Sequence, residues 1–429
     1  MLNPSPQIPP ERSNETSSFG SNDSYGSNDS YGSFSPPPPP SRWPDGKTIL
    51  KHLGLFLLTL ASVTYVGAMW VGQTANAESF TDLLPEGFLF AVLLLSFLGV
   101  HEFGHYFAGV YHRIDVTLPY FIPLPLGIGT MGAIIRIREQ IKTTRKLFDM
   151  GISGPLAGFV VSLGILLYGF ATLPPPTFIE NFVGHEEVVR HVQQTGEFPE
   201  KPVIPQGEAE VIVLGNTLLF SFIASFFEDV PPMYELYHYP FLFAGWLGLF
   251  FTALNLMPLG QLDGGHILYS LIGPRRHRVF ARVFFGGFTV LAGIEAISFM
   301  DVQLGLMAPG FRFVAPLVWA GVLFFLLRRA YDQDGAWVMP VWFSSLVLAW
   351  MYLLMSDMGF GFGADDGSPT ITGSMIWVVW SFFLVYFVRI QHPPVMIEEP
   401  LDRKRKVLGW LSMLILILCI SPAPIGLLS

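Results

Sequence analysis

Two histidines on one predicted helix face, His101 and His105, carry the clearest chemical signal in the chain. In a helix, residues i and i+4 lie on the same face, so both imidazoles can bind one metal ion. Glu102 directly follows the first histidine, where its carboxylate can accept a proton from a water held by that metal. The almost wholly apolar run 88–100 precedes this motif and places it at membrane depth, where ionisable groups are rare and usually functional.

A catalytic zinc needs a third protein ligand, and the best candidate in the sequence is Asp263. It lies in the polar stretch 255–266, which interrupts an apolar span, as expected where irregular backbone lines a cavity. At 1.5 Å per helical residue, His101 and Leu256 lie roughly 20 and 22 Å from the outer face, so the two segments reach similar depths. The alternative role for Asp263 is to cap the next helix.

Two other residues of the polar stretch have open roles. Asn255 could donate a hydrogen bond to the scissile carbonyl or its oxyanion, or it could bond to a neighbouring helix. His266 could orient the metal ligands through a hydrogen bond or have a structural role. Direct binding of the metal by His266 is the less favoured alternative. Three further acidic residues are expected to cap helices or pair with other groups rather than catalyse: Glu139, Asp149 and Glu295.

The elements that must position these residues are apolar helices. The 429 residues are 51% hydrophobic and 13% charged, with a mean hydropathy of +0.48. Soluble domains carry roughly 25% charged residues, so this composition predicts an integral membrane protein. The net charge of −9 gives no support for nucleic-acid binding. The single cysteine, Cys419, excludes an internal disulfide and a multi-cysteine metal site.

Nine apolar stretches are candidate membrane spans, since about 20 apolar residues cross roughly 30 Å of hydrocarbon. They lie near 50–72, 87–110, 150–172, 240–257, 283–300, 311–328, 338–356, 373–389 and 407–425. A further apolar stretch, 211–227, is short and is expected to be interfacial or re-entrant. With nine spans every basic cluster falls on one side, which is then cytoplasmic. The N-terminus would lie inside and the acidic loop 173–239 outside, unless re-entrant segments reverse the C-terminal half.

The predicted fold is an all-α polytopic membrane protein in four zones. Residues 1–46, rich in Ser, Gly and Pro, bury too little apolar surface to fold and are expected to be a disordered cytoplasmic tail. Residues 47–86 form the first span and an outer loop. The catalytic core, 87–282, includes the acidic insertion 173–239, and residues 283–429 form C-terminal spans.

Within the core, three helices near 87–110, 150–172 and 240–272 should hold the metal, with peripheral spans around them. The Pro- and Gly-rich segment 117–138 ends in an alternating Ile-Arg-Ile-Arg pattern, which is typical of a short strand. Such a strand could receive an unwound substrate at its edge. A simple re-entrant loop is the equally supported alternative.

Three motifs in this order resemble the site-2 protease family of intramembrane zinc metalloproteases. They are His101-Glu-Phe-Gly-His105, Gly154-Pro-Leu-Ala-Gly158, and Asn255-Leu-Met-Pro with Leu262-Asp-Gly. The runs 145–154 and 243–246 are similar to that family too, and the likeness covers about 87–282. Members without a PDZ domain, from bacteria, archaea and plastids, are the most similar in pattern.

The resemblance implies one Zn²⁺ per chain, bound by His101, His105 and Asp263. It also implies that Glu102 is the general base and acid and that Asn255 contacts the substrate. The chain departs from the family pattern at His266, where many relatives have arginine, and in its acidic insertion and terminal segments. These departures leave regulation and substrate choice open.

The expected function is hydrolysis of a peptide bond in or near a transmembrane segment of a single-span membrane protein within the lipid bilayer. An upstream site-1-type protease is a candidate partner, and the expected location is the bacterial inner (plasma) membrane. One alternative is a membrane-embedded zinc protease that cuts juxtamembrane or soluble tails. The other is a non-enzymatic transporter or scaffold with a structural metal.

The predicted topology can be tested with single cysteines introduced at Ser27 and Glu187 in a Cys419→Ala background. Because basic loops favour the cytoplasmic side, a membrane-impermeant thiol reagent added to intact cells should label position 187 and spare position 27. Labelling of both positions from the same side would contradict the span count between them.

Overall fold

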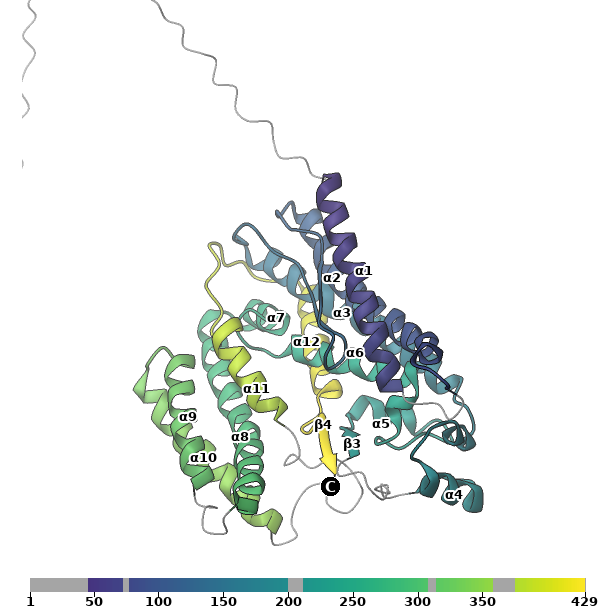
Figure 1. Ribbon diagram of the computed structural model, residues 1–429. Coiled ribbons are helices and arrows are strands. Elements are labelled where there is room, and N and C mark those ends of the chain that lie inside the picture. Colours follow the sequence, from purple (N-terminus) through teal and green to yellow (C-terminus); the bar gives the residue numbers. More distant parts are fainter. Residues whose placement is uncertain (1–44, 72–76, 200–210, 308–313, 358–374, 429) are drawn as a thin grey trace, which may run out of the picture. The chain divides into compact units, whose positions relative to one another are not determined.

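The computed structural model describes residues 45–71, 77–199, 211–307, 314–357 and 375–428. The predicted tail, 1–46, lies almost wholly outside these residues. The described chain is mostly helical and contains two small two-stranded sheets (Figure 1). The expectation of an all-α polytopic membrane protein is therefore confirmed.

Each of the nine apolar stretches corresponds to a helix. These are α1 (Gly46–Val71), α2 (Leu84–His112), α3 (Thr144–Ala171), α6 (Pro240–Leu256), α8 (Pro274–Met307), α9 (Val314–Ala330), α10 (Gly335–Asp357), α11 (Ile376–Phe383) continued by η5 (Leu384–Val388), and α12 (Arg403–Cys419). Among the described residues, five helices are long and apolar enough to cross a membrane: α1, α2, α3, α8 and α10. The four shorter helices stay predicted spans.

The region predicted to hold the metal is built on α2, which packs against α1, α3 and α6. Lipid tails are as apolar as leucine, so helices in a bilayer associate mainly where small residues allow close packing. The contact of α3 with α6 illustrates this. A Cβ at Gly245 would lie 2.9 Å from the Leu166 side chain, and one at Gly248 would lie 2.1 Å from Ser162 Oγ. The two helix backbones can approach this closely because neither glycine has a side chain.

The segment between α2 and α3 forms a β-hairpin. Strand β1 (Tyr120–Pro123) pairs antiparallel with β2 (Thr130–Ile134), with an irregularity between Phe121 and Pro123. The predicted strand in 117–138 is therefore present, but it precedes the Ile-Arg-Ile-Arg run, of which only Ile137 makes an isolated bridge. The hairpin loop is fixed to α1, because the Ser62 hydroxyl donates to the carbonyl of Gly129 at 2.8 Å.

The insertion 173–239 is partly folded in the described residues. It contains η2 (Pro176–Asn181), α4 (Glu186–Thr195), β3 (Val211–Leu214), α5 (Leu218–Ala224) and η3 (Leu236–His238). Strand β3 pairs antiparallel with β4 (Ile425–Leu428), which joins the insertion to the C-terminal end of the chain. The apolar stretch 211–227 thus forms a strand and a helix of 7 residues, which is too short to span a bilayer.

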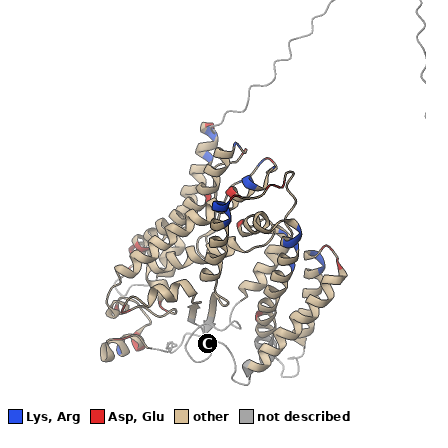
Figure 2. Cartoon of the chain, turned by 180° about the vertical axis from the view of Figure 1, so that it is seen from behind, with Lys and Arg blue, Asp and Glu red and all other residues tan. Residues whose placement is uncertain are grey.

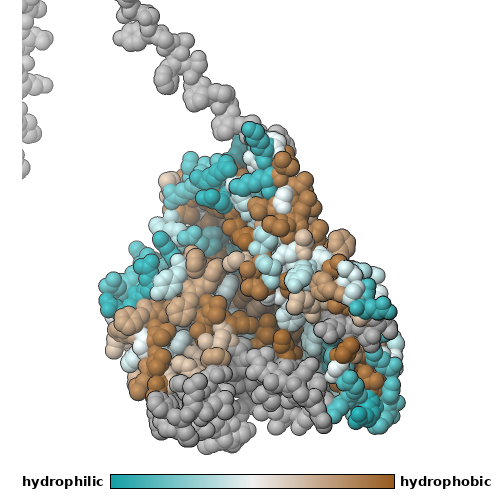
Figure 3. Space-filling model, viewed as in Figure 1, coloured by the Kyte–Doolittle hydropathy of each residue, from teal (hydrophilic) through white to brown (hydrophobic). Residues whose placement is uncertain are grey.

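The surface of the bundle fits contact with lipid. Large apolar side chains are exposed on several helices, for example Phe107, Phe325 and Phe387. Hydrophobic residues occupy much of the surface in Figure 3, whereas hydrophilic residues gather near the start of α1 and over α4. Lysines and arginines lie mainly toward the end of the bundle where α1, α8 and α12 begin (Figure 2). An aqueous surface at that end and an apolar belt below it follow from this distribution.

A partly buried ion pair joins α12 to α3. The guanidinium of Arg405 donates two hydrogen bonds of 2.7 Å to the carboxylate of Asp149, which also contacts His112 Nε2 at 2.9 Å. The hydrogen bonds that Arg405 donates to Asp149 and Asp402 raise the pKa of its guanidinium above the ordinary value, so this group stays charged. Asp149 is thus a pairing group, as its sequence position suggested.

Replacement of Arg405 by alanine should destabilise the protein. It removes a bidentate partner from Asp149, whose side chain is only 18% exposed. We expect the free energy of unfolding to fall by about 1–3 kcal/mol. The loss is smaller than the roughly 3–5 kcal/mol that follows when one partner of a fully buried ion pair is removed. Thermal unfolding in detergent measures the change, with the exposed Arg403→Ala as the matched control. Equal melting temperatures for the two variants would show that the pair does not stabilise the fold.

Candidate metal centre

Three predicted ligand atoms converge between α2 and the first turn of α7 (Asp263–Ile272). His101 Nε2 and His105 Nε2 lie 3.2 Å apart. Asp263 Oδ2 lies 3.5 Å from the first nitrogen and 3.3 Å from the second. Both histidines are buried, and the aspartate side chain is 14% exposed. The structure therefore brings together three residues that are up to 162 positions apart in the sequence.

The spacing of these atoms fits a tetrahedral zinc site. Zinc–nitrogen and zinc–oxygen bonds of about 2.0–2.2 Å place neighbouring ligands about 3.3–3.5 Å apart. His105 Nδ1 donates to the carbonyl of Met150 at 2.7 Å, so its Nε2 directs a lone pair toward the other two ligands. Two imidazoles and a carboxylate form a donor set that zinc prefers. The residues present thus fit a bound Zn²⁺.

Glu102 lies beside this set rather than within it. It is buried and one residue, or 100° of helix, away from His101. Its carboxylate interacts with the backbone of Ile135, which directly follows strand β2. The residue therefore lies between the ligands and the hairpin, where a carboxylate can exchange a proton with a group held at the metal.

Three glycines of α3 allow this helix to pack directly on the ligands. A Cβ at Gly154 would lie 2.1 Å from His105 Nε2, and a Cβ at Gly158 would lie 3.1 Å from the Cβ of His101. At Gly151 it would lie 3.1 Å from the carbonyl of Asp263. The Gly-Pro-Leu-Ala-Gly motif is thus explained by space, since any side chain at its first position would displace a ligand.

A tight turn delivers Asp263 from the end of α6. Pro258 stops the helix, and Gly260 adopts a left-handed φ of +47°. A Cβ at Gly264 would collide with the carbonyl of Leu256, at 1.8 Å, so glycine is required there. Leu262 occupies the N-cap position of α7. Asp263 is therefore not the capping residue, which leaves its side chain facing the histidines.

The two residues with open roles form hydrogen bonds with partners outside the set of proposed ligands. The Asn255 side-chain amide donates to the carbonyl of Phe251 in its own helix, at 3.1 Å. His266 Nδ1 lies 2.7 Å from His392 Nε2, so it contacts a histidine of the C-terminal part rather than the metal set. Glu295 accepts hydrogen bonds from the first backbone amides of α11, and Glu139 accepts one from Asp115. Both act as the expected capping or pairing groups.

A segment outside the predicted core, 389–402, packs against the Asp263 turn and α7. The carbonyl of Ile390 accepts a hydrogen bond from the amide of Gly260 at 3.0 Å, and Ile397 pairs with Thr143. Burial lowers the pKa of His392 to about 4, so this histidine is neutral at pH 7. This segment falls between the predicted spans 373–389 and 407–425, and no spacing pattern in the sequence predicts its contact with the Asp263 turn.

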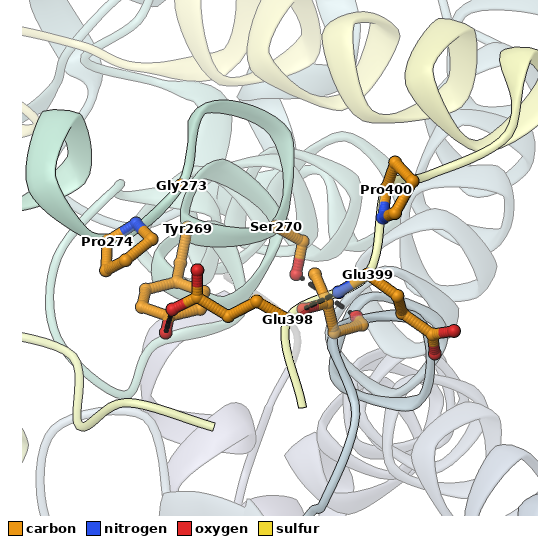
Figure 4. A pocket seen from close by; sticks show the side chains of 8 residues that line it. Tyr269, Ser270, Gly273, Pro274, Glu398, Glu399 and Pro400 are labelled. Atoms are coloured by element: carbon orange, nitrogen blue, oxygen red, sulfur yellow. Dashed lines mark hydrogen bonds between the residues drawn. The ribbon is translucent and has the colours of Figure 1, made fainter. Parts of the chain in front are cut away.

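A cavity of about 230 Å³ lies between α7 and this segment, lined by Thr144, Tyr269, Ser270, Gly273, Pro274, Glu398, Glu399 and Pro400 (Figure 4). Tyr269 donates to the Glu398 carboxylate at 3.3 Å. No ligand residue and no catalytic candidate lines this cavity. It is therefore separate from the metal centre.

Comparisons with known proteins agree with this geometry. Residues 89–294 match the family model described as Peptidase family M50. The probable zinc metalloprotease EGY2, chloroplastic, of Oryza sativa subsp. indica is 29% identical over 278 residues, 64% of this chain and 42% of that protein. EGY2 of Arabidopsis thaliana is 28% identical over 281 residues, 64% of this chain and 41% of its own length. The chain thus spans about two fifths of these relatives, and no solved structure matches it.

Substitution of Gly154 by alanine should weaken metal binding without touching a ligand. The new Cβ would meet the His105 imidazole and displace it from Asp263. Mutations of neighbouring groups that orient the ligands typically cost about 10–100-fold in metal affinity, and we expect a loss of this order. Competition with a chelator measures the affinity. Gly164→Ala, on the same helix with no atom within 4 Å of a new Cβ, is the matched control. Identical affinities in the two variants would contradict the role given to Gly154.

Proposed function

The chain belongs to the site-2 protease family, peptidase family M50, and from this premise we propose that it is a zinc metalloprotease of membrane-protein substrates. The peptide bond that it hydrolyses would lie in or near a transmembrane segment of a single-span membrane protein. The observation that carries this proposal is the convergence of His101, His105 and Asp263 beside a buried, non-ligating Glu102. These three side chains would hold a divalent zinc, which would lower the pKa of a bound water and polarise a carbonyl.

The proton chemistry falls to Glu102. Its carboxylate, which interacts electrostatically with His105 and Asp263, would remove a proton from the attacking water and deliver it to the leaving amine. The histidines share a face of α2, and the glutamate is turned 100° from His101. This separation leaves Glu102 free to carry the proton while the other three side chains bind the metal.

The β-hairpin is the proposed platform for the substrate. Amides within a helix are shielded by their own hydrogen bonds, so the substrate must unwind before it is cut. Strand β2 has only β1 as a partner in the described sheets, and Ile135, directly after β2, contacts Glu102. An extended substrate that pairs with the other edge of β2 would pass beside the catalytic carboxylate. Asn255 would turn from Phe251 to donate a hydrogen bond to the scissile carbonyl.

We also propose the orientation that the basic loops predict, with the N-terminus on the cytoplasmic side and the insertion 173–239 on the opposite side. Figure 2 supports this, because Lys and Arg gather near the starts of α1, α8 and α12. Location in a bacterial plasma membrane stays a prediction, since the relatives named above are chloroplastic. An upstream protease that prepares the substrate stays a prediction as well.

The open fourth position together with the buried Glu102 beside it argues against a purely structural metal at this site. Structural zinc sites are usually closed by four protein ligands, whereas catalytic sites keep one position open. In the part of the chain that the structure describes, only three ligand atoms converge at this site. Cleavage-site mapping separates the remaining alternative, a protease that cuts only juxtamembrane or soluble tails, because its product ends would fall outside the substrate's apolar segment.

Substitution of Glu102 by glutamine is the decisive test. The amide keeps the size of the side chain but cannot accept the proton, so cleavage should fall by about 10²–10⁴-fold while zinc content stays at one ion per catalytic site. Asp263→Ala should instead lower both zinc content and activity, because it removes a charged ligand. Zinc content is measured beside cleavage of a transmembrane substrate in liposomes.

The matched control is Glu86→Gln, an exposed glutamate in the first turn of the same helix. It should cut at the wild-type rate. Wild-type cleavage by Glu102→Gln would rule out the proposed proton transfer and favour a scaffold with a structural metal.

A further inference from the structure

A second cluster of potential metal ligands lies in the insertion, away from the catalytic centre. His185 precedes α4, whereas Glu235 and His238 flank and end the short helix η3. Glu235 Oε2 lies 3.0 Å from His185 Nε2 and 3.5 Å from His238 Nε2. The two histidine nitrogens are 3.1 Å apart. Three ligand atoms from two segments 50 residues apart therefore converge on one point.

Hydrogen bonds on the far side of each ring fix which nitrogens face this point. His238 Nδ1 lies 2.9 Å from the carbonyl of Val71, and His185 Nδ1 lies 3.0 Å from the carbonyl of Val183. A carbonyl can only accept, so both Nδ1 atoms must donate their protons. In the neutral rings both Nε2 atoms then carry lone pairs. Two lone pairs and a carboxylate oxygen face one another within 3.5 Å, an arrangement that needs either a shared proton or a metal cation among them.

The burial of Glu235 and His238 makes it more costly to leave the Glu235 charge uncompensated. The Glu235 side chain is 3% exposed and that of His238 is 4% exposed. The ring of Phe182 packs 4.1 Å from the His238 ring. In the described part of the chain no lysine or arginine pairs with Glu235. A carboxylate in so apolar a place is costly unless a cation compensates its charge.

We propose that His185, Glu235 and His238 bind a second metal ion, a divalent transition metal of which Zn²⁺ fits best. Zinc is commonly bound by imidazole and carboxylate groups. Ca²⁺ instead prefers oxygen ligands, so two histidines argue against a calcium site. Ligands of a tetrahedral zinc lie about 3.3–3.5 Å apart, and the bound ion would draw the present 3.0 to 3.5 Å set toward that spacing. The backbone carbonyls at the two Nδ1 atoms orient the rings, as partners of metal-bound histidines commonly do.

This site would fasten the insertion to the helical core. His185 directly follows the small apolar cluster around Ile179 and Phe182. His238 donates a hydrogen bond from Nδ1 to the carbonyl of Val71, the last residue of α1, and it lies two residues before α6 begins. The 17 residues of α6 separate this end from the Asp263 turn by roughly 25 Å. The second metal would thus hold the outer end of the helix that leads to the Asp263 turn, with its fourth position left to a ligand other than these three side chains.

Metal analysis of the full-length protein in detergent tests the proposal. Wild type should contain two zinc ions per chain, and His185→Ala with His238→Ala should contain one. His101→Ala with His105→Ala should also contain one, and the variant with all four changes should contain none. His191→Ala, a partly exposed histidine of α4 outside the cluster, is the matched control and should keep both ions.

A second measurement uses the protein that keeps only the proposed site. In the His101→Ala, His105→Ala variant, a strong chelator should lower the melting temperature, and added Zn²⁺ should restore it. The variant that also carries Glu235→Gln should lose this response while keeping its helical content. This comparison stays informative if the double histidine variant of the insertion fails to fold.

The proposal of a second site would be overturned if wild type contained one zinc ion and the His101→Ala, His105→Ala variant contained none. A shared proton would then hold the three groups of the insertion together. That result leaves the proposed protease intact, since the protease depends on Glu102 and the first ion. Conversely, two zinc ions together with an active Glu102→Gln variant would reject the proposed catalysis and keep the second site.

Discussion

The convergence of the proposed ligand atoms within 3.2 to 3.5 Å of one another inside an apolar helix bundle sets the main constraint on this structure. Lone pairs and a carboxylate at membrane depth are costly unless bound to a partner. The two histidines meet this requirement through one helix, where i and i+4 share a face. The aspartate cannot do so within a helix of the same span, so α6 must stop at Pro258 and turn Asp263 back toward α2.

Close backbone packing follows from that constraint. The helix that flanks the ligands, α3, has no side chain at Gly151, Gly154 and Gly158, where it contacts the Asp263 turn and the two histidines. In water such glycines would weaken a helix by roughly 1 kcal/mol each relative to alanine. In a bilayer they allow close van der Waals contact, which is what holds helices together there. The motif therefore positions the metal ligands without contributing a functional group.

The two His-His-carboxylate clusters share chemistry but differ in how they are built. The set of His101, His105 and Asp263 lies on a long helix and a tight turn, with the buried Glu102 next to it. The cluster of His185, Glu235 and His238 lies on short elements of the insertion, each ring oriented by a backbone carbonyl. The first arrangement suits a reaction that needs rigid positioning, and the second suits a fastening of an outer segment to the bundle.

Sequence alone determined the features that depend on local periodicity. Runs of apolar residues gave the nine helices, and the spacing of His101 and His105 gave a shared helix face with Glu102 beside it. The hairpin was predicted only in part, because strand pairing depends on two segments of the chain. The second strand lies at Thr130–Ile134, just before the alternating run from which a strand was predicted. Tertiary structure alone decided which distant residues meet. No spacing pattern joins His185 to Glu235 and His238, or His392 to His266, since packing of separate elements sets those contacts. Asn255 shows the same limit, because its partner in this structure is the carbonyl of Phe251 in its own helix rather than a neighbouring one.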